Sequence, residues 1–288
     1  MKAIFASLIA VLALTAGAKA DPAMWEVRDG DSAIHLFGSV HMLPPDLKWR
    51  TPALEDAIAK SEHVYFETDI GPRGFLALTI KMTIASFQQM SSPWLYLLTD
   101  QELAQLMDAL APLGMTVEQA GVTPPWMVSM QLAGAQMSGE GSTAYSFNAG
   151  VEWTLQWDLV PDRKAYLETP GEQFDLIAAG TVEEQVAALV AMLDETGTNT
   201  DALGEVIRAW AVGDVDALAA SVAPKNEAEQ ASIDVLLLKR NRNWIPALEQ
   251  LLAENREDLV VVGAAHLAGD GSVLDLLEQA GYTVTRIQ

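Results

Sequence analysis

The chain has 288 residues, of which 50% are hydrophobic and 19% charged, and its formal net charge is −22. A chain of this length and apolar content can bury a sizeable core. The strong negative charge argues against nucleic acid or an anionic membrane surface as a partner. The absence of cysteine excludes disulfides, thiolate catalysis and zinc sites built on cysteine.

The first twenty residues have the three parts of a secretory signal peptide. Met1-Lys2 is a short basic start, residues 4–16 are an uncharged apolar run, and Ala18-Lys19-Ala20 fits an A-x-A cleavage site. A membrane anchor is the alternative, but the run is shorter than the roughly 20 residues that span a bilayer. The sequence therefore predicts an exported protein, periplasmic or secreted, that begins at Asp21 and keeps no stable membrane anchor.

The predicted elements alternate between short strands and long helical stretches. A first strand pair has a turn at Asp29-Gly30, and Thr51-Pro52 can open a helix. The strands are predicted at residues 25–27, 34–37, 64–66, 164–167, 259–262 and 282–287. Helical patterns fill about 74–160 and 172–255, with helix starts at Thr99 and Thr181, each followed by a glutamate three residues on. We expect one α/β domain over residues 21–288, with a mixed sheet formed by both ends of the chain and a large helical insertion.

Four polar side chains follow the ends of predicted strands. His41 and His266 each come shortly after a strand, and Glu67 and Glu168 come directly after one. In an open α/β sheet with largely parallel strands, the carboxyl ends meet at one edge, and ligands bind there. If these strands share a sheet, the four residues converge.

The two histidine turns match each other, as Gly38-Ser39-Val40-His41 and Gly263-Ala264-Ala265-His266. Two imidazoles and a carboxylate are a ligand set for zinc or another first-row divalent ion. Such an ion with an open position acidifies bound water and polarises a carbonyl. Ordinary loop histidines are the alternative. His35 and His63, which lie within and before strands, are predicted to be structural.

These motifs resemble the TraB/GumN family, to which the TIKI proteins also belong. The resemblance rests on residues 36–45, 66–69, 167–169, 240–244 and 263–267 and covers essentially the whole mature chain. It implies a metal-dependent protease in which His41, His266 and Glu67 bind, or work beside, a divalent ion such as Mn, Co or Zn. The family often has Leu-Asp after the glutamate, where this chain has Thr68-Asp69, so a role for Asp69 stays open.

Further polar residues are candidates for the same site. Glu67 or Glu168 could act as general base, and Arg240 and Asn241 complete the candidate catalytic residues. Arg240 could stabilise an oxyanion or form an internal salt bridge, for example to Glu67 or Glu168. Glu152 lies in the first turn of a predicted helix. Its carboxylate could interact favourably with the helix dipole or reach the site.

The sequence thus predicts a metal-dependent hydrolase, most simply a peptidase acting on a peptide or protein. Two alternatives stay open. One is a non-enzymatic extracytoplasmic binding protein, and the other is a metal-dependent hydrolase of non-peptide esters or amides. The sequence contains neither H-E-x-x-H nor G-x-S-x-G, so a thermolysin-like helix site and a serine-hydrolase elbow are not expected.

Overall fold

The computed structural model describes residues 19–30, 32–89, 93–138, 145–195, 202–224, 227–254 and 256–288. The predicted signal peptide lies outside the described residues, apart from Lys19 and Ala20. Ala20 is buried, and its backbone N–H donates to the Lys48 carbonyl at 2.8 Å.

A mixed six-stranded sheet forms the centre of the fold. Its strands are β1 (Met24–Arg28), β2 (Ala33–Ser39), β3 (Val64–Phe66), β4 (Lys164–Tyr166), β5 (Glu257–Gly263) and β6 (Thr283–Arg286), in the order β4-β3-β5-β2-β1-β6. β2, β5, β3 and β4 run parallel, whereas β1 is antiparallel to β2 and β6. The predicted α/β class, with a sheet formed from both ends of the chain, is confirmed.

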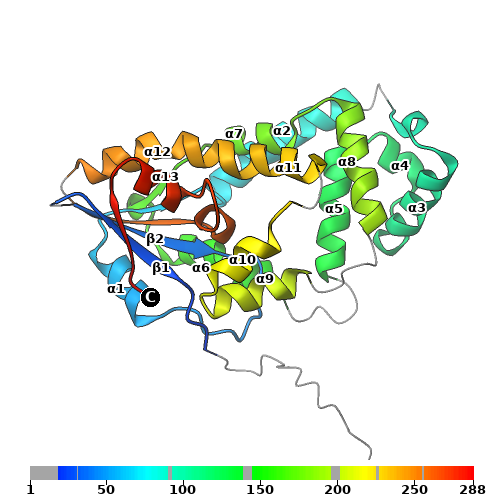
Figure 1. Ribbon diagram of the computed structural model, residues 1–288. Helices are drawn as coiled ribbons and strands as arrows, with labels where there is room; N and C mark the ends of the chain where they lie inside the picture. The colour runs from blue at the N-terminus through cyan, green and yellow to red at the C-terminus, as the bar shows by residue number, and fades with distance from the viewer. Residues whose placement is uncertain are drawn as a thin grey trace, which may run out of the picture.

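Helices cover both faces of the sheet (Figure 1). One face packs against α12 (Lys239–Leu252) and α13 (Val273–Gln279). The other packs against α1 (Pro52–Lys60), α6 (Val151–Asp158), α9 (Ala202–Ala211) and α10 (Val215–Ser221). β5 is apolar from Leu259 to Val262 because Val260 and Val262 join the first core while Leu259 and Val261 join the second.

The remaining helices form an arm beside the sheet, with α3, α4, α5 and α8 at its far end (Figure 1). Their bounds are α2 (Pro72–Gln89), α3 (Asp100–Leu110), α4 (Val117–Gly121), α5 (Pro125–Ser138), α7 (Pro170–Ile177) and α8 (Val182–Glu195). Trp94, Leu106, Val128 and Leu189 belong to a core of their own there. The helices between β3 and β5 therefore divide into this arm and the layers on the sheet.

Local signals for helix starts are confirmed. The Thr51 hydroxyl accepts from Leu54 N–H, and Thr99 and Glu102 form a reciprocal capping box. Arg240 and Asn241 lie within a long helical segment. α11 (Glu227–Ile233) runs through a π-helical turn, Asp234–Leu238, directly into α12, so both residues lie near the middle of the combined segment.

Within the described residues, no single helix is both long and apolar enough to cross a membrane. A bent pair, Pro170–Ile177 with Val182–Asp194, meets the length and composition required, with an angle of 75° between its two helices.

Candidate active site

The parallel strands place the candidate residues at one edge of the sheet. Ser39 at the end of β2 is aligned with Gly263 at the end of β5, and Phe66 of β3 is aligned with Tyr166 of β4. Residues that follow these positions leave the sheet at its carboxyl edge. The structure there brings Glu67, Glu168, Arg240, Asn241 and His266 into one buried polar network, with His41 beside it.

Arg240 is the centre of this network. Its Nε donates to Glu168 Oε1 at 2.9 Å, and its Nη2 donates to Glu168 Oε2 at 2.8 Å and to Glu67 Oε2 at 2.6 Å. Its Nη1 contacts the Leu236 carbonyl at 3.2 Å and His266 Nε2 at 3.1 Å. A guanidinium has five N–H donors, and all five are engaged. The salt-bridge role therefore accounts for Arg240 better than oxyanion stabilisation does.

Glu67 is held as a carboxylate. Its Oε1 accepts from Gly263 N–H at 2.6 Å, and its Oε2 accepts from Arg240 and from Gln173 Nε2 at 3.3 Å. Burial by itself raises the pKa of Glu67, but the charge that His266 carries when protonated at low pH, the charge of Arg240 and these hydrogen bonds outweigh it and lower the pKa to about 2. A carboxylate with so low a pKa is a weak proton acceptor at neutral pH.

His266 is buried and neutral. Burial lowers its pKa to about 4 because the charged imidazole is poorly solvated there. Since Arg240 can only donate, Nε2 is the acceptor and Nδ1 carries the proton, which faces Asn241 Oδ1 at 2.5 Å. Asn241 Nδ2 donates to the Gly271 carbonyl at 2.9 Å, so the amide is oriented with its Oδ1 towards His266. Asn241 therefore positions His266.

His41 has a different partner. Its Nδ1 lies 3.0 Å from Glu152 Oε1, which also accepts from the Ser39 hydroxyl. The negative charge of Glu152 and the bond to it raise the pKa of His41 to about 9. The His41 side chain is 66% exposed, whereas that of Glu152 is 8% exposed. The pair is an exposed imidazole held by a buried carboxylate, and it lies beside the polar network.

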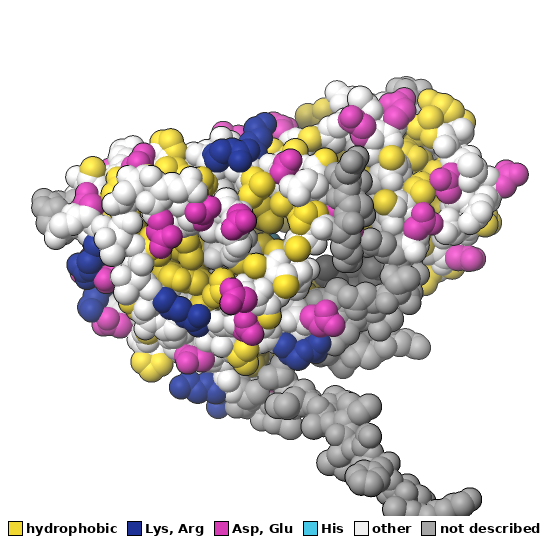
Figure 2. All heavy atoms as spheres, in the orientation of Figure 1, with side chains coloured by type: hydrophobic (Ala, Val, Ile, Leu, Met, Phe, Trp, Pro, Cys, Tyr) yellow, Lys and Arg dark blue, Asp and Glu magenta, His cyan; other side chains and the backbone are white. Residues whose placement is uncertain are grey.

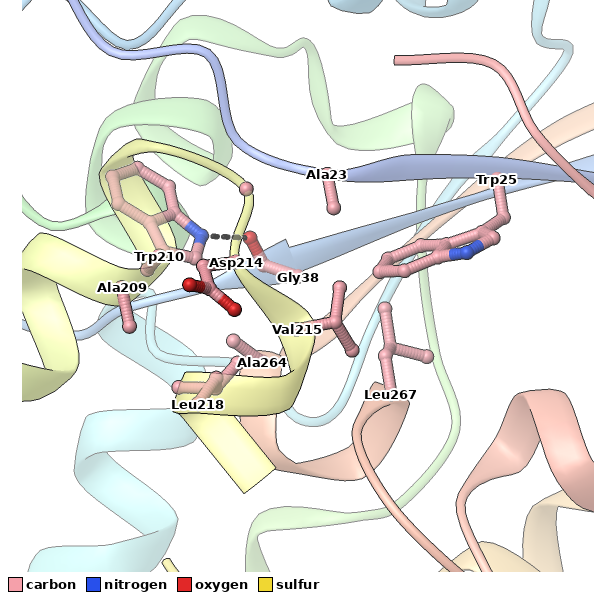
Figure 3. A pocket seen from close by; sticks show the side chains of 11 residues that line it. Ala23, Trp25, Gly38, Ala209, Trp210, Asp214, Val215, Leu218, Ala264 and Leu267 are labelled. Carbon is pink, nitrogen blue, oxygen red and sulfur yellow. Dashed lines mark hydrogen bonds between the residues drawn. The ribbon is translucent and has the colours of Figure 1, made fainter. Parts of the chain in front are cut away.

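Close backbone approach at glycines shapes both histidine turns. A Cβ on Gly38 would lie 3.1 Å from Ala264, and a Cβ on Gly150, which precedes α6, would lie 2.0 Å from the His41 carbonyl oxygen. Figure 3 shows the region beneath these turns, where the Trp210 indole donates to the Gly38 carbonyl at 2.7 Å. The mainly apolar space there has a volume of about 10 Å³, no more than a single water needs. It is a packing feature and not a ligand site.

The site includes contacts that the sequence did not reveal, among them those of Glu152 and Trp244. Glu152 was weighed mainly as a helix-dipole residue, but it bonds His41 across 111 positions of the chain, which no local pattern reveals. Trp244 donates from Nε1 to Glu168 Oε1 at 2.9 Å, and its ring lies 4.8 Å from the Arg240 guanidinium carbon. Its spacing of four residues from Arg240 places both on one helix face and could have indicated this contact.

The predicted metal ligands do not fit a divalent ion as they are placed here. The Nε2 lone pair of His266 and Oε2 of Glu67 face the cationic guanidinium of Arg240, and the Nδ1 of His41 faces Glu152. His266 Nε2 and Glu67 Oε1 are 3.6 Å apart. No group of three potential ligands suited to a metal occurs among the described residues. Binding an ion at these residues requires Arg240 to move away.

The fold and site define an α/β protein with a polar centre at the carboxyl edge of a largely parallel sheet. A sequence model of the TraB/PrgY/gumN family matches residues 23–286, and the chain belongs to this family. The predicted family resemblance is thereby confirmed.

A second likeness covers part of the chain. ATP synthase subunit delta of Thioalkalivibrio sulfidiphilus (strain HL-EbGR7) is 30% identical over 141 residues, which cover 44% of this chain and 77% of that protein. This stretch is less than half of the chain, whereas the family match includes the whole sheet and the polar centre. No solved structure matches the chain significantly.

Proposed function

We propose that this protein is a hydrolase of amide or ester bonds, with peptides as its main substrates, and that His41 and Glu152 are its acid–base pair. The observation that supports this most directly is the exposed imidazole of His41 held by a buried carboxylate. A carboxylate that orients an imidazole through Nδ1 leaves Nε2 free to exchange protons with substrate, a recurrent arrangement in acyl-transfer enzymes.

In the proposed reaction, Nε2 of His41 takes a proton from water as the water oxygen adds to the acyl carbon. The same proton then passes from Nε2 to the leaving nitrogen or oxygen as its bond to carbon breaks. A carboxylic acid and an amine or alcohol are released, and His41 returns to its first state. Glu152 Oε1 keeps the proton on Nδ1 throughout and stabilises the imidazolium.

The buried network would support this chemistry indirectly. Glu67 and Glu168 are both bonded to Arg240, so neither is well placed as a general base. Their salt bridges fix the ends of β3 and β4 against α12. The divalent ion that the family resemblance implies would supply Lewis acidity, but no step is assigned to it because the present donor set does not fit it.

Protonation of His41 gives the proposal a specific pH dependence. Since its pKa is raised to about 9, only about 1% of His41 is free to act as a base at pH 7. The value of kcat/KM should therefore rise about tenfold per pH unit below 9 and then level off. In Glu152→Gln the charge that raises the pKa of His41 is gone, so the rising part of the pH profile of kcat/KM should move towards pH 6.5.

The experiment is a pH series of turnover on a panel of peptides and esters, with the metal content of the same preparation measured. His41→Gln should lose at least about a hundredfold in kcat/KM. His63→Gln is the matched control, since His63 precedes β3 at the opposite edge of the sheet, and it should retain full activity. Full activity in His41→Gln would refute the acid–base assignment. Tight binding of a peptide without turnover would favour a binding module.

Export is part of the proposal because of the predicted signal peptide. N-terminal sequencing of the protein recovered from a periplasmic or culture fraction should begin at Asp21. A chain that starts at Met1 would contradict this.

A further inference from the structure

Several large apolar side chains of α2 are exposed along one side of the helix. Leu76, Ile80, Ile84 and Phe87 are 60%, 52%, 53% and 69% exposed. At about 100° per residue, these four side chains fall within an arc of about 80° on one side of the helix. We call them the outer stripe of α2. Single exposed apolar residues are ordinary, but a continuous stripe along a helix indicates an interaction surface.

The outer stripe is not the face that holds α2 to the rest of the fold. Leu78 and Met82, on nearly the opposite side of the helix, pack against the cluster of Trp126, Met127 and Phe174. The Lys81 ammonium is bonded to Asp175 at 2.6 Å and to the Gly171 carbonyl. The helix is thus anchored by one apolar face and exposes a second.

The charge around the stripe limits the partners that it suits. Acidic side chains are spread over both the sheet and the arm on the face shown in Figure 2, and the net charge of −22 repels an anionic bilayer. α2 itself contains no acidic residue, and its two basic residues are Arg73 and Lys81. A partner surface for the stripe should therefore be apolar and uncharged, as the stripe itself is.

The spacing of the stripe makes it self-complementary. The four residues are arranged almost symmetrically about position 82. Two copies of α2 laid antiparallel about a two-fold axis would place Ile80 of one copy against Ile84 of the second, and Leu76 against Phe87. A two-fold interface requires such a patch, in which residue i contacts j and j contacts i.

The area is also sufficient for two copies. The exposed parts of these four side chains amount to roughly 1,000 Å² over two chains, about the minimum for a specific interface. We propose that the outer stripe of α2 is a homodimer interface, in which two copies of this chain pack their α2 helices antiparallel. The two negatively charged copies repel each other, so dimerisation should strengthen with salt as this repulsion is screened.

Sedimentation equilibrium of purified protein, expressed from the full-length sequence, tests the proposal at 20 and 500 mM NaCl. A dimer should form at micromolar concentration and bind more tightly at high salt. Ile80→Glu/Ile84→Glu should be monomeric with unchanged circular dichroism and Tm, because both side chains are exposed. Val212→Glu, at a position 71% exposed and outside α2, is the matched control and should remain dimeric.

Two further measurements test the pairing itself. Ile80→Lys/Ile84→Lys should be monomeric alone and form a heterodimer when mixed with the Glu variant. Because the chain has no cysteine, Ile80→Cys mixed with Ile84→Cys should cross-link faster than either does with itself. A wild-type monomer at all concentrations, a dimer that survives the Glu substitutions, or a monomer that co-sediments with phosphatidylcholine vesicles would overturn the proposal.

Discussion

Replacing Arg240 with methionine tests whether the buried salt bridges hold the polar centre together. Arg240, Glu67 and Glu168 have side chains that are only 8–9% exposed. The substitution keeps an unbranched side chain of similar length but removes every N–H donor. It leaves two carboxylates buried at the strand ends without a cation between them.

The expected loss of stability follows from that uncompensated charge. Removing one partner of a buried ion pair costs about 3–5 kcal/mol, because the remaining charge stays out of water. For a chain of this size, each kcal/mol lowers Tm by about 2–4 °C, so Tm should fall by roughly 10 °C. Arg28→Met is the control: Arg28 is paired with Glu26, but its side chain is 53% exposed, so the loss should be at most about 1 kcal/mol.

The loss should also depend on pH. In the wild type the pKa of Glu67 is lowered to about 2, from 4.5 in an unperturbed glutamate. A depressed carboxyl pKa stabilises the fold above pH 4.5, and that stability disappears as the pH falls towards 2. Without Arg240 its charge and its hydrogen bond to Glu67 are absent, so part of this contribution is lost. The difference in unfolding free energy between wild type and Arg240→Met should therefore shrink as the pH falls from about 4.5 towards 2.

Urea unfolding followed by circular dichroism at a series of pH values measures both effects. Arg240→Met should also lower the unfolding free energy less in a Glu168→Gln background than in the wild type, because only one buried carboxylate is then left without a cation. A loss below about 1 kcal/mol at pH 7, or a loss that is the same at pH 7 and near pH 2, would refute the view that Arg240 neutralises these carboxylates.

Three other substitutions test the packing around the site and the caps. Gly150→Ala should destabilise the fold by about 1–3 kcal/mol, because its Cβ would overlap the His41 carbonyl; urea unfolding measures this, and an unchanged midpoint would contradict it. Trp244→Phe removes the indole donor to Glu168 and should cost about 1–3 kcal/mol of unfolding free energy in the same assay. A much smaller loss would mean that Trp244 only fills space. Thr99→Ala removes the cap of α3 and should lower the unfolding free energy by about 1 kcal/mol, with no change in turnover of the peptides and esters.

The sequence by itself determined the features that depend on neighbours in the chain. Thr51 and Thr99 were recognised as helix caps because a cap needs only a hydroxyl and the three residues after it. The four apolar residues from Leu259 to Val262 were recognised as a buried strand because a sheet covered on both faces needs apolar residues at every position. The matching glycine–histidine turns identified the edge of the sheet at which the site lies.

The tertiary structure decided which side chains at that edge are partners. Arg240 could be read as an oxyanion donor or as a salt bridge, and only the positions of Glu67, Glu168 and His266 show that its donors are all engaged. Glu152 became a site residue because α6 begins beside the turn that carries His41. Hydrogen bonds act over about 3 Å, so assigning them requires the distances between strands and helices, and residue types and spacing leave these open.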